Sequence, residues 1–153
     1  MSELNTDDLK FLSEFQKITG IYPSDCLYTG FAFAFLVDNR GELYKCIGKN
    51  KIILNKLIQA FRKPVFLFLK GSDLETQIRN FFHNLSDMRI KFNEKDGGKQ
   101  VVLIVLEPER GYAVGKDGNK IKVIREFLNK RFGIKDFQLR TTKQFSDNES
   151  PLI

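Results

Sequence analysis

The residues best suited to chemistry form a glycine-rich loop, Gly111-Tyr-Ala-Val-Gly115-Lys-Asp-Gly118. The apolar residues that follow it, Ile121, Ile124 and Leu128, are spaced three and four apart, which predicts one face of a helix that begins where the loop ends. The first backbone N–H groups of a helix have no partner within it, and the helix dipole is positive there. Together with Lys116, they predict an anion site that suits the phosphates of a long chain better than a free nucleotide.

Three kinds of site are compatible with this loop. A P-loop that hydrolyses nucleotides needs four residues between its glycines and a Ser or Thr after the lysine. Here three residues separate Gly111 from Gly115 and Asp117 follows the lysine, so this interpretation is weak. A helix cap without a ligand is the second interpretation. The third is a G-x-x-G loop, Gly115 to Gly118, that grips the backbone of single-stranded nucleic acid.

A weaker copy of the loop lies earlier in the chain, at Gly48-Lys-Asn-Lys51. Internal duplication is the economical explanation, because a single offset relates the loops and the helices that follow them. Aligning Gly48 on Gly115 gives an offset of 67 residues, which also pairs Lys49 with Lys116, Leu54 with Ile121, Leu57 with Ile124 and Phe61 with Leu128.

The first copy departs from the pattern at two places. Lys51 stands where the second copy has Gly118, and Tyr44 stands where it has Gly111. A side chain at position 51 blocks close approach of a nucleic-acid backbone, or strains the chain if that residue needs a positive φ. The second loop is therefore predicted to carry most of the grip, with the first loop as an electrostatic extension.

Positive charge is gathered around both loops. Residues 110–140 hold nine Lys and Arg against three Asp and Glu, and residues 40–63 hold seven against one. Each block is thus +6, and the rest of the chain is −6, which leaves the overall net charge of +6. Lysines that only decorate solvated helix faces are the alternative, but two basic blocks that coincide with two phosphate-type loops favour a polyanionic partner.

Other classes of protein find little support. No apolar run reaches the length of a membrane span, and the acidic, polar start does not resemble a signal peptide, so a cytoplasmic protein is expected. Cys26, Cys46 and His83 lack the spacing of a zinc site. A single histidine supports no Ser/His/Asp or Cys/His set. We therefore expect no enzyme, metal, cofactor or small-molecule substrate.

The predicted elements describe an α+β protein with two similar halves and a boundary at Lys70-Gly71. The first helix has the apolar stripe Leu9, Leu12 and Phe15, and Phe31, Phe33 and Phe35 alternate as core residues of a strand. Ser72 and Glu75 predict a capping box for the helix after the boundary. The expected elements are a helix from Thr6, a hairpin over 25–37, helices over 41–47 and 51–62, a strand over 64–69, a helix from Ser72, strands over 88–93 and 99–106, the loop with its helix, and a strand over 134–140.

The loop and its surroundings resemble a known family. Glu109-Arg-Gly-Tyr-Ala-Val-Gly-Lys-Asp-Gly-Asn-Lys-Ile-Lys122 is similar to the signature of NusA-type KH domains. Phe11 to Gly20, Pro23 to Cys26 and Lys130 to Ile134 are similar to short archaeal NusA-like factors. The resemblance implies two tandem type II KH domains, each a three-stranded mixed sheet packed against helices. The domains are expected at 1–70, with the degenerate loop, and at 71–140, with the intact loop, followed by a disordered tail at 141–153.

The resemblance also implies which residues meet RNA. Gly115, Lys116, Asp117 and Gly118 match the loop that grips phosphates, and Val114 and Ile121 match positions that line an apolar groove for bases. Charge is expected from Lys116, Lys120 and Arg110. Gly48, Lys49, Asn50 and Lys51 form the expected secondary RNA-binding loop.

The function that follows is binding of single-stranded RNA by a NusA-like transcription elongation or termination factor, with RNA polymerase as a further candidate partner. The alternative is a protein-interaction module that docks on RNA polymerase or the ribosome and binds little RNA itself. A flat salt dependence, or a large exposed phenylalanine patch on the first domain, would favour the alternative.

Overall fold

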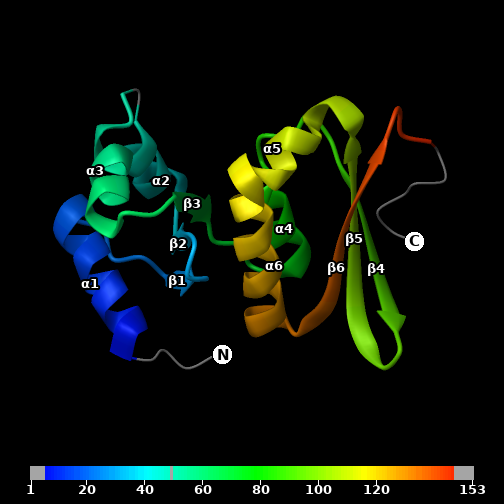
Figure 1. Cartoon of the computed structure of the whole chain (residues 1–153), viewed down its shortest axis with the longest axis horizontal. Coiled ribbons are helices and arrows are strands. Elements are labelled where there is room, and N and C mark those ends of the chain that lie inside the picture. The colour runs from blue at the N-terminus through cyan, green and yellow to red at the C-terminus, as the bar shows by residue number, and fades with distance from the viewer. Residues whose placement is uncertain (1–5, 49, 147–153) are drawn as a thin grey trace. The chain divides into compact units, whose positions relative to one another are not determined.

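A computed structural model of the chain describes residues 6–48 and 50–146. Lys49 of the secondary loop and residues 147–153 of the expected tail lie outside the described residues. The chain divides between Phe81 and Phe82 into two compact units, which we call unit 1 and unit 2. Each unit contains its own sheet and helices (Figure 1).

Unit 1 is built on a three-stranded mixed sheet with the order β1-β2-β3. The central strand β2 is antiparallel to β1 and parallel to β3, so the chain between β2 and β3 forms a crossover that contains two helices. The elements in chain order are α1 (Thr6–Thr19), β1 (Asp25–Tyr28), β2 (Phe33–Val37), α2 (Arg40–Ile47), α3 (Ile52–Phe61), β3 (Val65–Leu69) and α4 (Leu74–Phe81).

The core of unit 1 lies between its sheet and helices α1, α2 and α3. Phe33 and Phe35 of β2 are buried in it, as their alternation predicts. Phe11 of α1 meets Phe33 edge to face, with ring centroids 4.8 Å apart. Such pairs contribute beyond the area they bury, so these rings fix α1 on the sheet.

Two predicted core positions of unit 1 are wrong. Phe31 is 67% exposed because it precedes β2, in the turn where the Thr29 N–H donates to the Ala32 carbonyl, and so does not follow the alternation of the strand. Leu9 is 51% exposed, because α1 presents Phe11 to the core instead.

Helix α4 begins at a different cap from the one predicted. Asp73, not Ser72, accepts the hydrogen bond from the Thr76 N–H, at 2.8 Å. That bond favours the ionised carboxylate and lowers the pKa of Asp73. Both residue types make good N-caps, and the capping-box pattern alone does not distinguish neighbours.

The chain around Gly71 is tightly held rather than a loose linker. The Gly71 N–H donates to Gln77 Oε1 at 2.8 Å, and Gln77 Nε2 donates to the Leu69 carbonyl at 3.1 Å. Phe68 of β3 packs edge to face on Phe81 of α4, with centroids 4.8 Å apart. These contacts place α4 with unit 1, whereas a KH domain boundary at residue 71 stays a prediction.

Unit 2 repeats the topology of unit 1. Its sheet has the order β4-β5-β6, with β5 antiparallel to β4 and parallel to β6. Residues 101–105 of β5 are all buried, as expected for the most apolar strand. The elements are β4 (Arg89–Lys95), β5 (Gly98–Leu106), η1 (Glu107–Glu109), α5 (Arg110–Val114), η2 (Lys116–Gly118), α6 (Asn119–Phe132) and β6 (Ile134–Thr142), where η marks a 3₁₀ turn.

The two ends of the unit 2 sheet have simple explanations. Asp96 and Gly97 join β4 to β5 with φ of 52° and 75°, and two positive φ values suit the twist of a two-residue hairpin. Strand β6 is longer than predicted, because Thr141 and Thr142 pair with Val105 and Leu106. The first two residues of the expected tail, Thr141 and Thr142, therefore belong to strand β6.

The structure confirms the predicted fold class at the level of α+β architecture, with two three-stranded mixed sheets packed against helices. The order of strand, strand, helix, helix and strand occurs in both units, in agreement with the repeat seen in the sequence. Within the described ranges, no helix is both long and apolar enough to cross a membrane.

Candidate nucleic-acid interface

The loop of unit 2 has a backbone that only glycine adopts readily at its first position. Gly115 has φ 78° and ψ 170°, in a region of the Ramachandran plot that is essentially restricted to glycine. Asp117 and Gly118 follow in the left-handed helical region, with φ of 56° and 73°. The Gly115 N–H donates to the Gly111 carbonyl at 2.9 Å, which ends α5 and starts the loop.

Close packing also requires a glycine at position 115. A Cβ built on Gly115 would lie 2.5 Å from Cβ of Lys120 and 3.2 Å from its backbone nitrogen. The same atom built on Gly118 would meet nothing closer than Lys122 Cε at 3.7 Å, an ordinary contact. Packing inside unit 2 therefore requires a glycine at position 115, whereas at position 118 a Cβ would make only an ordinary van der Waals contact.

The predicted RNA-binding residues of unit 2 divide into two groups. Arg110, Lys116 and Asp117 are exposed, and Gly115 and Gly118 are half-buried beside them. They lie at the start of α6, a 14-residue helix whose N-terminus has no side-chain cap, so its first amides are not occupied by a side chain of the described chain. Val114 is half-buried, but Ile121 is only 7% exposed and belongs to the core.

Lys120 lies in the interior rather than on the surface. The residue is 8% exposed, and its Nζ lies 3.3 Å from the Tyr112 carbonyl and 3.3 Å from Asn84 Oδ1. The ammonium also faces the ring of Phe82, 5.8 Å from its centroid. Burial disfavours the charged form and lowers the pKa of Lys120 to about 8. The sequence suggested that Lys120 presents its charge to a ligand at the loop. In the structure the ammonium is instead directed into the interior of unit 2.

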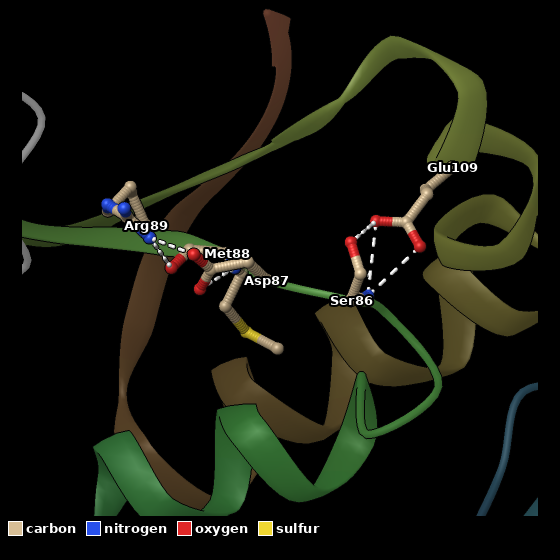
Figure 2. A network of polar contacts seen from close by, with 5 residues as sticks. All are labelled: Ser86, Asp87, Met88, Arg89 and Glu109. Atoms are coloured by element: carbon tan, nitrogen blue, oxygen red, sulfur yellow. Dashed lines mark hydrogen bonds and ion pairs between the residues drawn. The ribbon is translucent and has the colours of Figure 1, made fainter. Parts of the chain in front are cut away.

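Glu109 holds the start of α5, a role that the sequence analysis missed. Its carboxylate accepts from the Ser86 N–H at 3.0 and 3.2 Å and from the Ser86 hydroxyl at 2.7 Å (Figure 2). Nearby, Arg89 donates to Asp87 at 2.7 Å, while the Asp87 carboxylate accepts from the Met88 N–H at 2.8 Å (Figure 2). No local pattern signals the Glu109 contact, because its partner is 23 residues away.

The first and last residues of the unit 1 loop, Gly48 and Lys51, have backbone conformations similar to those of Gly115 and Gly118. Gly48 has φ 56° and ψ 177°, close to Gly115, and its N–H donates to the Tyr44 carbonyl at 2.7 Å. Lys51 has φ 53° and ψ 29°, so it adopts the left-handed conformation of Gly118 with a side chain present. Lys51 and Asn50 are exposed, and Tyr44 is 63% exposed. The condition under which the sequence predicts strain at Lys51, a positive φ, is therefore met.

Among residues 6–48 and 50–146, no group of three or more His, Cys, Asp or Glu side chains is placed to hold a metal ion. Cys26 and Cys46 are both buried, and burial raises the pKa of the Cys46 thiol.

The fold and the loops together define a class: two tandem α+β units of one topology, each with a glycine-led loop between two helices. The crystal structure of APE1850 is similar to this chain, with a TM-score of 0.75 and 31% sequence identity, over 90% of this chain and 100% of that one. No family model matches the chain.

Three curated archaeal relatives, each named "Probable transcription termination protein NusA", are similar over most of their length. The relative from Thermoplasma acidophilum is 23% identical over 92% of this chain and 98% of its own. That from Methanococcus vannielii is 27% identical, over 90% and 79%, and that from Halococcus morrhuae is 24% identical, over 89% and 96%. The chain is therefore similar to archaeal NusA-like proteins over about nine tenths of its length, which confirms that resemblance.

Proposed function

We propose that this protein binds single-stranded RNA as a NusA-like transcription elongation or termination factor, with two type II KH domains that correspond to the two repeats. The names of the archaeal relatives support the transcriptional role. The observation that supports RNA binding most directly is the unit 2 loop, where Gly115 and Gly118 flank exposed Lys116 at the uncapped start of α6. Such a loop offers backbone amides, a positive dipole and a lysine to phosphate.

Unit 2 is proposed to carry most of the affinity. Gly118 has no side chain to hinder the approach of an RNA backbone, whereas Lys51 has one at the equivalent position of unit 1. With three or four phosphates held per domain, log affinity falls with log salt at a slope of about −2 to −3 for each domain that engages RNA. The basic block of residues 40–63 adds positive charge that favours a polyanionic partner.

Binding of short fluorescent single-stranded RNAs, followed by anisotropy at several salt concentrations, tests this proposal. Gly118→Asp and Gly118→Asn form a matched pair, because Asp and Asn have the same shape and both tolerate a left-handed backbone. The two variants differ in charge alone. We expect Gly118→Asp to weaken binding far more than Gly118→Asn, and Lys51→Ala to have a small effect. Equal affinity of the two Gly118 variants would show that no phosphate lies at this loop.

The alternative function, docking on RNA polymerase or the ribosome, rests on a different observation. Unit 1 exposes large apolar side chains, among them Phe31, Tyr44 and Ile52. A wild-type protein whose RNA affinity is weak and insensitive to salt would favour this function, with unit 1 as the docking surface.

A further inference from the structure

Helix α5 is too short to be stable without contacts from the rest of unit 2. It has five residues and no side-chain N-cap, and a single helical turn gains too few hydrogen bonds to offset the ordering of its backbone. Its position matters, because the Gly115 N–H donates to the Gly111 carbonyl and the loop therefore starts from α5. Contacts from outside the helix must fix it.

Lys120 supplies such a contact from beneath the loop. Its ammonium hydrogen-bonds the Tyr112 carbonyl, in the middle of α5, and Asn84 Oδ1, on the segment that precedes β4. Its Cβ fills the space under Gly115. The side chain thus touches the loop at its base and α5 at its centre, while Glu109 anchors the other end of α5 to Ser86.

Unit 1 provides a natural comparison. Its helix α2 has eight residues and an N-cap of its own, since Asn39 accepts from the Glu42 N–H. At the offset of 67 residues, the position of Lys120 is occupied by Ile53, which packs against the core. The buried lysine therefore occurs in the unit whose helix before the loop is short and lacks a side-chain cap.

We propose that Lys120 is a positioning residue, which pins α5 to Asn84 and so presets the Gly115–Gly118 loop for phosphate without touching RNA itself. The part that concerns RNA rests on the proposed function. Two of the three ammonium donors are used inside unit 2, and the side chain is almost wholly buried, so little of its charge is available for a direct contact. A lysine two residues after a G-x-x-G loop thus acts on the loop from within.

The salt dependence of RNA binding separates positioning from direct contact. Lys116→Ala is the matched control, because it removes an exposed lysine from the loop itself. A lost phosphate contact makes the slope of log affinity against log salt shallower by about 0.7. We expect this shallower slope for Lys116→Ala. For Lys120→Ile, which installs the residue found in unit 1, we expect an unchanged slope and an RNA affinity about tenfold lower at every salt concentration. A tenfold loss corresponds to the free energy of a hydrogen bond to a charged group.

Hydrogen exchange of the backbone amides, measured without RNA, tests the structural half independently. Residues 111–121 should exchange faster in Lys120→Ile and in Asn84→Ala, and at the wild-type rate in Lys116→Ala. Because Asn84 is exposed, we expect Asn84→Ala to fold, so this variant tests the inference if Lys120→Ile does not fold. Unchanged exchange in Asn84→Ala, or a shallower salt slope for Lys120→Ile, would overturn the inference. A wild type that binds no RNA while exchange responds as expected would overturn the proposed function but not the positioning role.

Discussion

The interior position of Lys120 makes the stability of unit 2 depend on pH in an unusual direction. An unfolded lysine releases its proton near pH 10.5, whereas burial lowers the pKa of Lys120 to about 8 in the folded chain. Between these values the unfolded state binds more protons than the folded one. The free energy of unfolding should therefore rise with pH above about 8, as the cost of burying the charge is relieved, and this gain is lost as pH falls through 8.

The magnitude follows from the difference between the two pKa values. One pKa unit corresponds to about 1.4 kcal/mol, so the full effect is about 3 kcal/mol, of which about 1 kcal/mol appears between pH 7 and pH 9. Other groups titrate in the same range. The Cys46 thiol, whose pKa burial raises, acts in the opposite direction because its unfolded form ionises first. The contribution of Lys120 must therefore be read as a difference between proteins.

Urea unfolding followed by circular dichroism, for wild type and Lys120→Ile at pH 7 and pH 9, measures this difference. Wild type should gain about 1 kcal/mol more than Lys120→Ile between the two pH values. The ionisation of Cys46 cancels in the comparison because both proteins keep it. A pH dependence shared by both proteins, or a relative loss in wild type, would refute the placement of a charged ammonium in this interior.

Two further predictions concern the loop backbones. Gly115→Ala should destabilise the protein more than Gly48→Ala, because both substitutions force the same glycine-restricted backbone but only the first meets Lys120 Cβ at 2.5 Å, while Gly48 has nothing closer than 3.9 Å. Thermal unfolding of the pair checks this, and equal losses would contradict the close approach. Lys51→Gly should stabilise unit 1 by about 0.5–1 kcal/mol, since it removes the strain of a side chain at positive φ. A lower denaturation midpoint for Lys51→Gly than for wild type would show that the Lys51 side chain makes a compensating contact.

The sequence was a good guide wherever local pattern decides structure. The repeat offset predicted that Gly48 and Gly115 are equivalent, and both have the same unusual backbone and the same hydrogen bond four residues back. Alternation placed Phe33 and Phe35 in the core. These features depend on neighbours in the chain, so periodicity and residue type are enough to find them.

The sequence was a poor guide wherever distant residues decide. The sequence analysis placed Lys120 at the surface. The two acceptors of its ammonium, Asn84 Oδ1 and the Tyr112 carbonyl, lie 36 and 8 residues away in the chain, so no local pattern reveals them. Glu109 was not singled out for the same reason. Phe31 was misplaced because the alternating pattern continues one step beyond the strand into the turn. Long polar side chains and strand ends were thus the hardest to place.

The similar backbone conformations at the first and last positions of the two loops change what a G-x-x-G pattern can be used to find. The first glycine is demanded by the backbone in both repeats, whereas Lys51 shows that the second position accepts a side chain without a change of conformation. A search that requires both glycines would overlook the first repeat of this chain. One that requires only the leading glycine, between two helices of a mixed sheet, would recover both, and would reveal duplicated ancestry in chains where one copy has diverged.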